Sequence, residues 1–595
     1  MTATVDTALA VPAALRRYNI TLLLVAGLGG LLYGIDVGII GGALPYLEAT
    51  SGLTVAELSV IVAAVLLGSV FSTLFAGILA DWMGRKRLMI LSGFTFALSI
   101  PVIALSHGYG PLFFGRLLQG MSGGLIGVVV PLYLAECLSA SNRGRGTAIF
   151  QWMLTLGIVA AALVGIYFSY RVADVARAGN ATVLFQFKDR AWRSIFWVSL
   201  PPGILFVLGS LLVSESPRWL FRHASKDEAY AALLRSRSFE QASIEIEEME
   251  ELARSAQRNA SPRMHGSLLR RRYIIPFLLA CAILSCNQAT GVNSIIGYNA
   301  GILLQSGLGD LQAHWGYVLF TCVNFLATSI GMTLVDRRGR RFLMILGISG
   351  VIVSLVSVGL LFRNTETQTT DCRAAVQALV GPNEELTLHF DPAMATTLLG
   401  ARGNPTEGID NSHASLVIIY SYGDFTSATS FVRSGDPAAR PIEINRASCV
   451  PSNRIEAFFK NPLANLEAAR SAPLKINKAF IGRIPESQHG WLVALGLFGF
   501  MAFYALGPGV VVWLALSELM PTRIRSNGMS IALVINQLVS TALAGIFLPF
   551  VSKHGYSSMF FLFAGFTSVY FLVVALFLPE TKGKTLEEIE AHFAS

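Results

Sequence analysis

The stretch Asp81-Trp82-Met83-Gly84-Arg85-Lys86-Arg87 recurs in altered form as Asp336-Arg337-Arg338-Gly339-Arg340-Arg341. Each copy ends an apolar run of about twenty residues and begins another, and about twenty such residues span a bilayer as a helix. A charge cluster that recurs at the edges of membrane-length runs indicates two similar helical bundles. Proteins built in this way usually bind their substrate between the bundles, so the repeat predicts a membrane transporter.

The composition is typical of a membrane protein rather than a soluble one. Of 595 residues, 53% are hydrophobic and only 14% are charged, and the mean hydropathy is +0.57. The net charge of +8 is explained by Lys and Arg in short loops between helices, so we expect no nucleic-acid binding. The first eighteen residues are polar and end in Arg16-Arg17-Tyr18, which predicts no cleavable signal peptide.

Hydropathy along the chain predicts an all-α membrane protein with twelve transmembrane helices in two pseudo-symmetric six-helix bundles. The predicted spans are 19–41, 57–80, 88–106, 112–135, 147–169, 193–213, 273–304, 314–335, 342–362, 490–517, 526–551 and 557–578.

Short basic loops follow the second, fourth, eighth and tenth spans, on the same side as both termini. By the positive-inside rule that side is the cytoplasm, so we predict a multi-pass cell-membrane protein with both termini cytoplasmic. The predicted parts are an N-terminal tail (1–18), a six-helix bundle (19–213), cytoplasmic linker helices (214–272), a second bundle in two pieces (273–362 and 490–578), an extracytoplasmic insertion (364–489) and a cytoplasmic C-terminal tail (579–595).

The spacing of matched residues locates two insertions. The offset from Asp81 to Asp336 is 255, whereas the offset from Glu136 to Glu518 is 382. The extra residues coincide with the polar segment between spans nine and ten. A smaller polar loop, 170–191, accounts for the remaining mismatch in the first half.

The larger insertion is expected to be a small α+β domain. Residues 417–420 and 429–432 have the composition of short strands, and 454–471 has the pattern of an amphipathic helix. Cys372 and Cys449 both lie in this segment, and they could form a disulfide if it faces an oxidising compartment.

An ordered set of motifs runs through both halves of the chain, outside the tails and the two insertions. The motifs are Gly77 to Arg87, Arg116 to Gly120, Pro131 to Glu136 with Arg143-Gly144, Ser214 to Leu220, Asn287 to Asn293, Asp336 to Arg341, Gly507-Pro508-Gly509 with Trp513, Glu518 to Arg525 and Pro579 to Gly583. This set resembles the sugar porter family of the major facilitator superfamily. The long outside insertion is similar to that of the proton-coupled myo-inositol members.

Asp36 and Arg116 are the candidate proton-coupling residues. Asp36 lies in the first span and Arg116 in the fourth, at similar expected depth, so the two could pair. A charge inside the membrane is costly unless it is compensated. The functional interpretation is that protonation of Asp36 frees Arg116 and couples transport to the proton gradient. The alternative is a purely structural ion pair.

The charged motif residues are expected to form a cytoplasmic gate. Salt bridges between the halves would close the inside entrance, and their loss would open it. The alternative is that these charges only set the topology. The predicted gate residues are Asp81, Arg85, Glu136, Arg143, Glu215, Arg218, Asp336, Arg340, Glu518, Arg525 and Glu580. Trp82 stands where the family usually has Arg.

The resemblance also implies a sugar site of neutral hydrogen-bonding groups and one aromatic face. Amides both donate to and accept from hydroxyl groups, and Trp packs against the C–H face of a sugar ring. Any one buried amide could instead be a packing link between helices. The candidates are Gln151, Asn287, Gln288, Asn293, Tyr298, Asn324, Trp513 and Asn536. Gly291, Gly297 and Gly301 in span seven and the Gly507-Pro508-Gly509 run in span ten are expected to break those helices and act as hinges, and close helix packing is the alternative.

The predicted function is proton-coupled symport of a monosaccharide or polyol by alternating access, by a protein active as a monomer in a lipid bilayer. A proton-independent facilitator is the alternative, and a sugar sensor on a transporter scaffold is a more distant one. No enzyme is expected, because the sequence shows no metal-spaced His or Cys cluster and no nucleophile motif. We therefore expect no cofactor and no bound metal, with the proton gradient as energy source.

Overall fold

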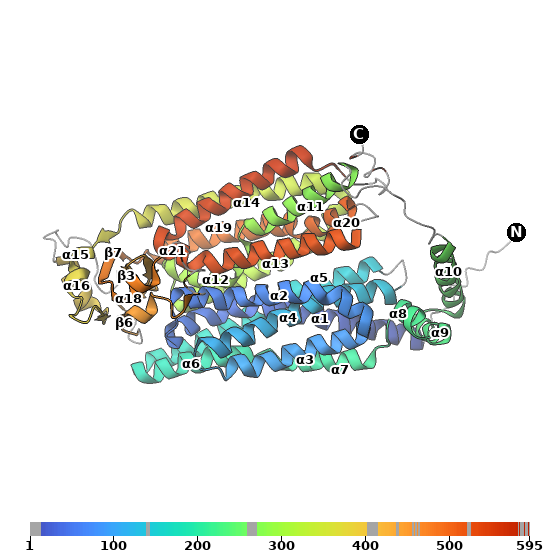
Figure 1. Cartoon of the computed structure of the whole chain (residues 1–595), viewed down its shortest axis with the longest axis horizontal. Coiled ribbons are helices and arrows are strands. Elements are labelled where there is room, and N and C mark those ends of the chain that lie inside the picture. Colours follow the sequence, from blue (N-terminus) through green and yellow to red (C-terminus); the bar gives the residue numbers. More distant parts are fainter. Residues whose placement is uncertain are drawn as a thin grey trace.

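A computed structural model describes residues 13–138, 143–258, 271–400, 414–435, 440–454, 464–520 and 525–580, together with 457, 461, 582, 588 and 593. Two bundles of long helices lie side by side, and a small domain that contains strands lies at one end of them (Figure 1). The linker helices lie at the opposite end (Figure 1).

The first bundle contains seven helices that form six spans. They are α1 (Ala13–Ser51), α2 (Val55–Met83), α3 (Arg85–Ala104), α4 (Tyr109–Cys137), α5 (Arg143–Arg177), α6 (Ala181–Val198) and α7 (Leu200–Leu212). Helices α6 and α7 together form the sixth span, 181–212. The linker follows as α8 (Pro217–His223), α9 (Lys226–Leu234) and α10 (Phe239–Arg258).

The second bundle is built in the same way. Its helices are α11 (Arg271–Ala289), α12 (Val292–Gln305), α13 (Asp310–Arg338), α14 (Arg340–Glu366), α19 (Ser487–Leu506), α20 (Pro508–Leu519) and α21 (Arg525–Phe577). Gly291, with φ +81°, separates α11 from α12, and Gly507 separates α19 from α20. The breaks predicted at Gly291 and Gly507 are therefore confirmed, whereas those predicted at Gly297 and Gly301 are wrong, because both residues lie within α12.

Twelve spans follow from these helices, as the sequence predicts. Among the described residues, eleven helical segments are long and apolar enough to cross a membrane. The last of them contains a non-helical residue, Gly555, with φ +84° and ψ 164°. A straight helix of its 53 residues would be roughly 80 Å long, more than twice the thickness of a bilayer core. Helix α21 therefore contains the eleventh and twelfth spans.

Two predicted boundaries are wrong. The first span does not end near residue 41, because α1 continues to Ser51. The segment 170–191 is not a loop, because α5 runs to Arg177 and α6 begins at Ala181, where the Asn180 side chain caps its N-terminus. Polar residues here extend the helices beyond the apolar spans instead of ending them.

The segment between α14 and α19, which we call the cap domain, is an α+β unit as expected. Its main sheet has the strand order β1-β7-β3-β4, with β5 paired to β3 and all pairings antiparallel. A second sheet pairs β2 with β6. The elements are β1 (Thr370–Asp371), α15 (Arg373–Ala378), β2 (Leu386–Leu388), α16 (Pro392–Gly400), β3 (Ala414–Tyr422), β4 (Phe425–Ala428), β5 (Val432–Arg433), β6 (Ile442–Ile444), η2 (Arg446–Ser448), α18 (Leu466–Ser471) and β7 (Leu474–Arg483).

Within the cap domain the strand expected at 417–420 is confirmed as part of β3. The strand expected at 429–432 is wrong, because 429–431 connect β4 to β5. The single helix expected over 454–471 is also wrong: residues 454 and 457 are helical, but 461, 464 and 465 are not, and the separate helix α18 begins after its N-cap Asn465. Part of that stretch, 455–456, 458–460 and 462–463, lies outside the described residues.

The two cysteines of the cap domain do not form the disulfide that the sequence leaves possible. Cys372 and Cys449 belong to the same buried core, but they are not bonded to each other. The Cys372 thiol donates to the carbonyl of Ala479, and the Cys449 thiol donates to that of Phe425. Burial raises the pKa of Cys372 to about 12, with a smaller contribution from the adjacent Asp371 carboxylate.

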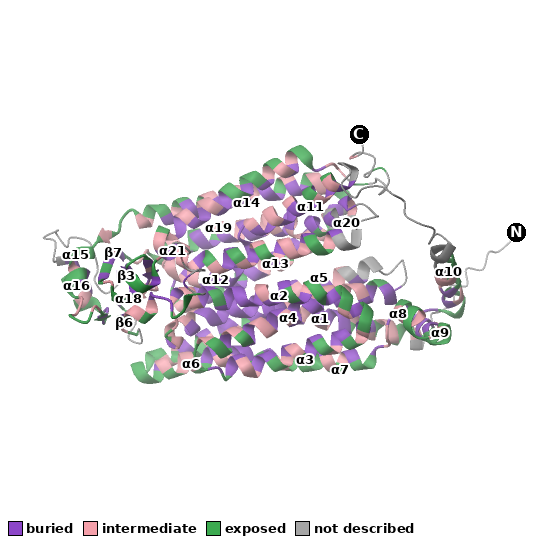
Figure 2. Ribbon diagram, in the orientation of Figure 1, coloured by how far each residue is buried: buried purple, intermediate pink, exposed green. Residues whose placement is uncertain are grey.

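The hydrophobic cores show where the two bundles meet. Near the cap domain one core contains residues of both bundles, for example Ile61 of α2 with Tyr298 of α12 and Phe547 of α21. Toward the linker helices, each bundle instead has a core of its own. Buried residues concentrate between the helices, whereas many outward-facing positions are exposed (Figure 2). We call the two ends of the molecule the cap end and the linker end.

Candidate functional site between the two bundles

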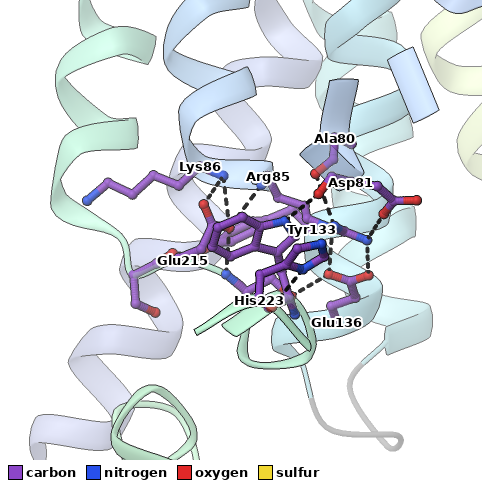
Figure 3. A network of polar contacts seen from close by, with 11 residues as sticks. Ala80, Asp81, Arg85, Lys86, Tyr133, Glu136, Glu215 and His223 are labelled. Carbon is purple, nitrogen blue, oxygen red and sulfur yellow. Dashed lines mark hydrogen bonds and ion pairs between the residues drawn. The ribbon is translucent and has the colours of Figure 1, made fainter. Parts of the chain in front are cut away.

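The repeated charge cluster of the first bundle surrounds the N-terminus of α3 (Figure 3). The Arg85 guanidinium is nearly buried and lies 2.9 Å from both Asp81 and Glu136 carboxylate oxygens. The Glu215 carboxylate accepts hydrogen bonds from the backbone N–H groups of Arg85 (2.9 Å) and Lys86 (3.1 Å). A carboxylate at a helix N-terminus satisfies donors that have no partner within the helix.

The second bundle has a similar arrangement at the N-terminus of α14. The Glu580 carboxylate accepts from the backbone N–H groups of Arg340 (3.0 Å) and Arg341 (3.1 Å) at the start of α14. Arg340 donates to Glu518 Oε1 at 3.2 Å, as Arg85 does to Glu136. The two clusters are therefore structural copies, as the sequence repeat indicates.

One glycine in each cluster leaves room for the carboxylate. Gly84 has φ +94° and Gly339 has φ +91°, a backbone conformation that favours glycine. A Cβ on Gly84 would overlap the Glu215 carboxylate, and a Cβ on Gly339 would lie 2.7 Å from Glu580 Oε2. Trp82, which stands where the family usually has Arg, is 75% exposed.

The gate residues are brought together within each bundle. Every ion pair that is described among them joins residues of one bundle, so the expected cross-bundle pairs stay a prediction. Arg218 is exposed on α8. The side chains of Arg143, Asp336 and Arg525 lie outside the described part of the structure.

At the cap end, hydrogen bonds cross directly between the bundles. Ser59 Oγ of α2 lies 3.1 Å from the Tyr298 hydroxyl of α12 and accepts the backbone N–H of Leu548 at 3.2 Å. The Tyr298 hydroxyl also lies 3.0 Å from the carbonyl of Ala544, and its ring stacks on Phe547 at 4.4 Å. Tyr298 therefore helps to close the cap end, in addition to its predicted place at the sugar site.

Four predicted sugar-site amides lie on α11, α12 and α21. Asn287 donates to the Tyr504 hydroxyl at 3.1 Å, while its Oδ1 is buried without a partner among the described residues. Asn293 donates to Gln288 Oε1 (3.0 Å) and to the Ser540 hydroxyl (2.8 Å). Asn536 is fully buried, and neither of its amide atoms has a described partner.

Three other candidates have different surroundings. Asn324 is buried on α13, where its Oδ1 accepts from Thr328 at 3.4 Å. Gln151 is partly buried on α5, next to Trp152, whose indole N–H donates to Ser329 across the two bundles at 3.1 Å. Trp513 is 41% exposed on α20 and is the candidate least enclosed by protein.

Asp36 and Arg116 are both buried, but they do not form the expected direct ion pair. Neither carboxylate oxygen of Asp36 has a hydrogen-bond partner among the described residues. Arg116 instead donates to Gln119 Oε1 at 2.6 Å and lies over the Phe196 ring. Asp36 faces Gly123, which lies about two helical turns from Arg116 along α4. The two residues therefore lie at different depths, because α1 extends further than the sequence predicts.

A cavity at the cap end lies apart from most of the residues predicted for the sugar site. Its volume is about 940 Å³, and it lies between the cap domain and the ends of both bundles. Of the eight sugar-site candidates only Tyr298 lines it. The cap domain roofs this cavity through contacts with both bundles: Arg433 with the Leu304 carbonyl, and Arg440 with the Phe185 ring.

Sequence reasoning missed Tyr33, Ser59, Tyr504 and Ser540. Tyr33 lies one turn before Asp36, and its ring lies against Gly123 and close to the side chain of Gln537 in the other bundle. Each of these residues carries a hydroxyl group in an apolar span, and none belongs to the motifs from which the site was predicted. Helical spacing from a motif residue is the signal that could have identified Tyr33, three positions before Asp36.

The sequence matches a family model described as "Sugar (and other) transporter" over residues 22–380 and 476–593. The unmatched stretch between them falls within the cap domain. The human proton myo-inositol cotransporter is 27% identical over 96% of this chain and 81% of its own length. The glucose transporter GlcP of Staphylococcus epidermidis is 24% identical over 95% of each chain.

Solved structures show the same fold. The inward open conformation of the xylose transporter XylE from E. coli superposes with a TM-score of 0.63 at 20% identity. That match covers 97% of this chain and 100% of XylE. XylE bound to 6-bromo-6-deoxy-D-glucose, described as a proton:xylose symporter, gives a TM-score of 0.61.

Proposed function

The chain belongs to the sugar transporter family of the major facilitator superfamily, and on this premise we propose that it is a proton-coupled symporter of a monosaccharide or polyol. Family membership and the relatives support sugar or polyol transport. The linker end, with its basic loops and charge clusters, faces the cytoplasm, and the cap domain faces outside.

One observation carries the proton coupling: a carboxyl group, Asp36, is buried in the first span without a described partner. An ionised carboxylate in such a place costs several kcal/mol, so the site favours a bound proton or an approaching cation. Arg116 lies on the facing helix and can supply that cation when Asp36 ionises. The proton and Arg116 then compete for the same carboxyl group.

Tyr33 supports a link between Asp36 and the sugar site. It lies one turn from Asp36 on α1 and close to Gln537 on α21. Gln537 follows Asn536, whose amide has no described partner and is free to bind hydroxyl groups. A substrate bound between the bundles would therefore contact groups that adjoin the proton site.

The conformation supports alternating access. The bundles share a core and hydrogen bonds at the cap end, and they have separate cores at the linker end. This is the arrangement of a transporter that is closed outside. Formation of cross-bundle salt bridges at the linker end, with rupture of the Ser59–Tyr298 contact, would produce the opposite state.

Proton movement tests the proposal. Substrate added to de-energised cells that express the protein should make the medium alkaline, because protons enter with the substrate. myo-Inositol, glucose and xylose are the first compounds to test, since the relatives are named for them. Substrate uptake without alkalinisation would favour the facilitator instead.

A further inference from the structure

The cavity at the cap end lies between the cap domain and the contact that closes the two bundles. Tyr298 and Leu548 both line it. Both also contact Ser59, whose Oγ lies 3.1 Å from the Tyr298 hydroxyl and accepts the Leu548 N–H at 3.2 Å. On the opposite side, the cap domain supplies Tyr420 and Arg433 to the lining. The closed contact is therefore the floor of this cavity, and the cap domain is its roof.

The size and charge of the cavity suit a small neutral molecule. Sites for small molecules have volumes of about 300–1,000 Å³, and this cavity has a volume of about 940 Å³. Among the described residues that line it, acidic and basic side chains are equal in number, so a ligand with a net charge is not favoured. The acids are Glu48, Asp310 and Glu443, and the bases are Lys188, Arg433 and Arg440.

Asp310 is a hydrogen-bond acceptor that is held in place at the wall of this cavity. Its Oδ2 accepts from the Tyr46 hydroxyl at 2.8 Å and from the Ser169 hydroxyl at 2.6 Å. The side chain nevertheless keeps 34% of its surface accessible. A carboxylate that is already immobilised binds a ligand hydroxyl group with little further loss of side-chain freedom.

Tyr556 of α21 presents a hydroxyl group to the same cavity. The residue is only 6% exposed, yet its hydroxyl group has no hydrogen-bond partner among the described residues. A buried Tyr usually finds a partner for its O–H. Glu48 of α1 lies close to Tyr556 and to Ser430 of the cap domain. Both bundles and the cap domain thus bring polar groups to one place.

The rest of the lining favours a ligand with many hydroxyl groups. Such a ligand has apolar C–H faces, which pack against aromatic rings, and hydroxyl groups, which both donate and accept hydrogen bonds. The cavity offers the rings of Tyr420 and Phe431 for the first and the amides of Gln312 and Asn445 for the second. A neutral monosaccharide or polyol is therefore the ligand class that this lining suits.

We propose that the cavity is an outer binding chamber, which holds one molecule of the transported sugar or polyol while the bundles are closed outside. Asp310, Glu48 and Tyr556 bind its hydroxyl groups, and the cap domain covers it. This inference rests on the proposed function, because the ligand is the transported substrate. It adds a second site to that function. The chamber releases its molecule toward the sugar site when the Ser59–Tyr298 contact breaks.

Protection of one introduced thiol tests the chamber in the full-length protein. Ala176 is exposed and lines the cavity at the end of α5, so Ala176→Cys should react with N-ethylmaleimide. myo-Inositol, glucose and xylose are each added as the protecting compound. At about ten times its dissociation constant, a compound that occupies the chamber should slow the reaction about tenfold, because about one chamber in ten stays empty.

A thiol outside the chamber is the matched control. Ala178 is exposed near the same end of α5 but does not line the cavity, so the reaction of Ala178→Cys should not slow. Mass spectrometry of each modified site gives the rates. Uptake of the same three compounds by the wild-type protein identifies which of them is transported.

Further substitutions, each combined with Ala176→Cys, separate the chamber from the sugar site. Asp310→Asn and Glu48→Gln each replace a charged acceptor with a neutral one of the same shape. Each should raise the concentration for half-maximal protection about five- to tenfold, since a hydrogen bond to a charged group is stronger than one to a neutral group. Asp174→Asn, which changes an exposed acid of α5 outside the cavity, should leave this concentration unchanged.

The double variant Asn287→Ala with Asn536→Ala should also leave half-maximal protection unchanged, because both amides belong to the predicted sugar site and neither lines the cavity. Two results would overturn the inference. One is a reaction of Ala176→Cys that none of the three compounds slows. The other is protection that the double variant abolishes and that Asp310→Asn and Glu48→Gln leave unchanged, since it would then arise from the sugar site.

Failure of the chamber and failure of the proposed symport remain distinguishable. Uptake of a compound that does not protect Ala176→Cys rejects the chamber and leaves the transport function standing. Uptake without alkalinisation of the medium rejects proton coupling and leaves the chamber standing, because the protection measurement involves no proton gradient.

Discussion

The hydroxyl groups of Ser59 and Tyr298 lie 3.1 Å apart although 239 positions separate them in sequence, and they belong to opposite bundles. This contact lies within the shared core of the cap end. The corresponding linker-end clusters, Arg85 with Glu136 and Arg340 with Glu518, stay within their own bundles. Closure at one end and separate cores at the other define the state that the structure shows.

Ser59→Ala should shift the protein toward opening at the cap end. The change removes the contacts with Tyr298 and with the Leu548 N–H, worth roughly 1 kcal/mol, or about a fivefold change in the ratio of closed to open protein. Spin labels on Ala178→Cys and Asn364→Cys, exposed positions near the cap end of opposite bundles, measure this ratio through the distance between them. Ser357→Ala is the control, because that hydroxyl bonds a carbonyl of its own helix. Equal effects of the two changes would contradict the assigned role of Ser59.

Glu136→Ala should strongly destabilise the first bundle. It leaves the buried Arg85 guanidinium with one partner fewer, and loss of one member of a buried pair costs about 3–5 kcal/mol. Glu518→Ala should cost less, since the Arg340–Glu518 pair is more exposed. Asp174→Ala, in an exposed pair, should have an effect below about 1 kcal/mol. The free energy of unfolding of each purified variant in detergent measures this order. A larger loss of stability for Asp174→Ala than for Glu136→Ala would refute it.

Asn536→Ala and Asn287→Ala should each weaken substrate binding about five- to tenfold, because each removes one hydrogen bond to a hydroxyl group. The loss should appear mainly in KM, since the amides bind the substrate without reacting with it. Initial rates of uptake provide both constants. Asn477→Ala, a matched amide in the cap domain, serves as the control. Unchanged KM values for both site variants would place the sugar elsewhere.

Cys372 should resist alkylation at pH 8. Burial raises its pKa from the usual 9.0 to about 12, so its thiolate fraction falls roughly a thousandfold. The protection should persist until the pH approaches 12. Ser452→Cys places an exposed thiol in the same domain and should react rapidly with N-ethylmaleimide. Mass spectrometry of the two sites gives the rates, and equal rates would show that Cys372 is not buried in this way.

The sequence predicted those parts of the molecule that repeat or that follow from hydropathy. The offset between Asp81 and Asp336 locates two clusters that the structure shows to be copies, and the apolar runs match the twelve spans. The register of the cap-domain strands could not be predicted, because β3 and β7 pair across about sixty residues and their ladder contains a bulge. The sequence also could not predict that Asp36 and Arg116 form no direct pair, since their relative depth depends on where α1 ends.

The central claim is that Asp36 couples transport to protons, and Asp36→Asn in proteoliposomes tests it most directly. With an imposed pH gradient, inside alkaline, the wild-type protein should accumulate its substrate uphill. The variant should lose uphill accumulation, because an amide cannot carry the proton, yet retain counterflow exchange of labelled for unlabelled substrate. If Asp36→Asn leaves uphill accumulation intact while abolishing only counterflow, the account of proton coupling is wrong.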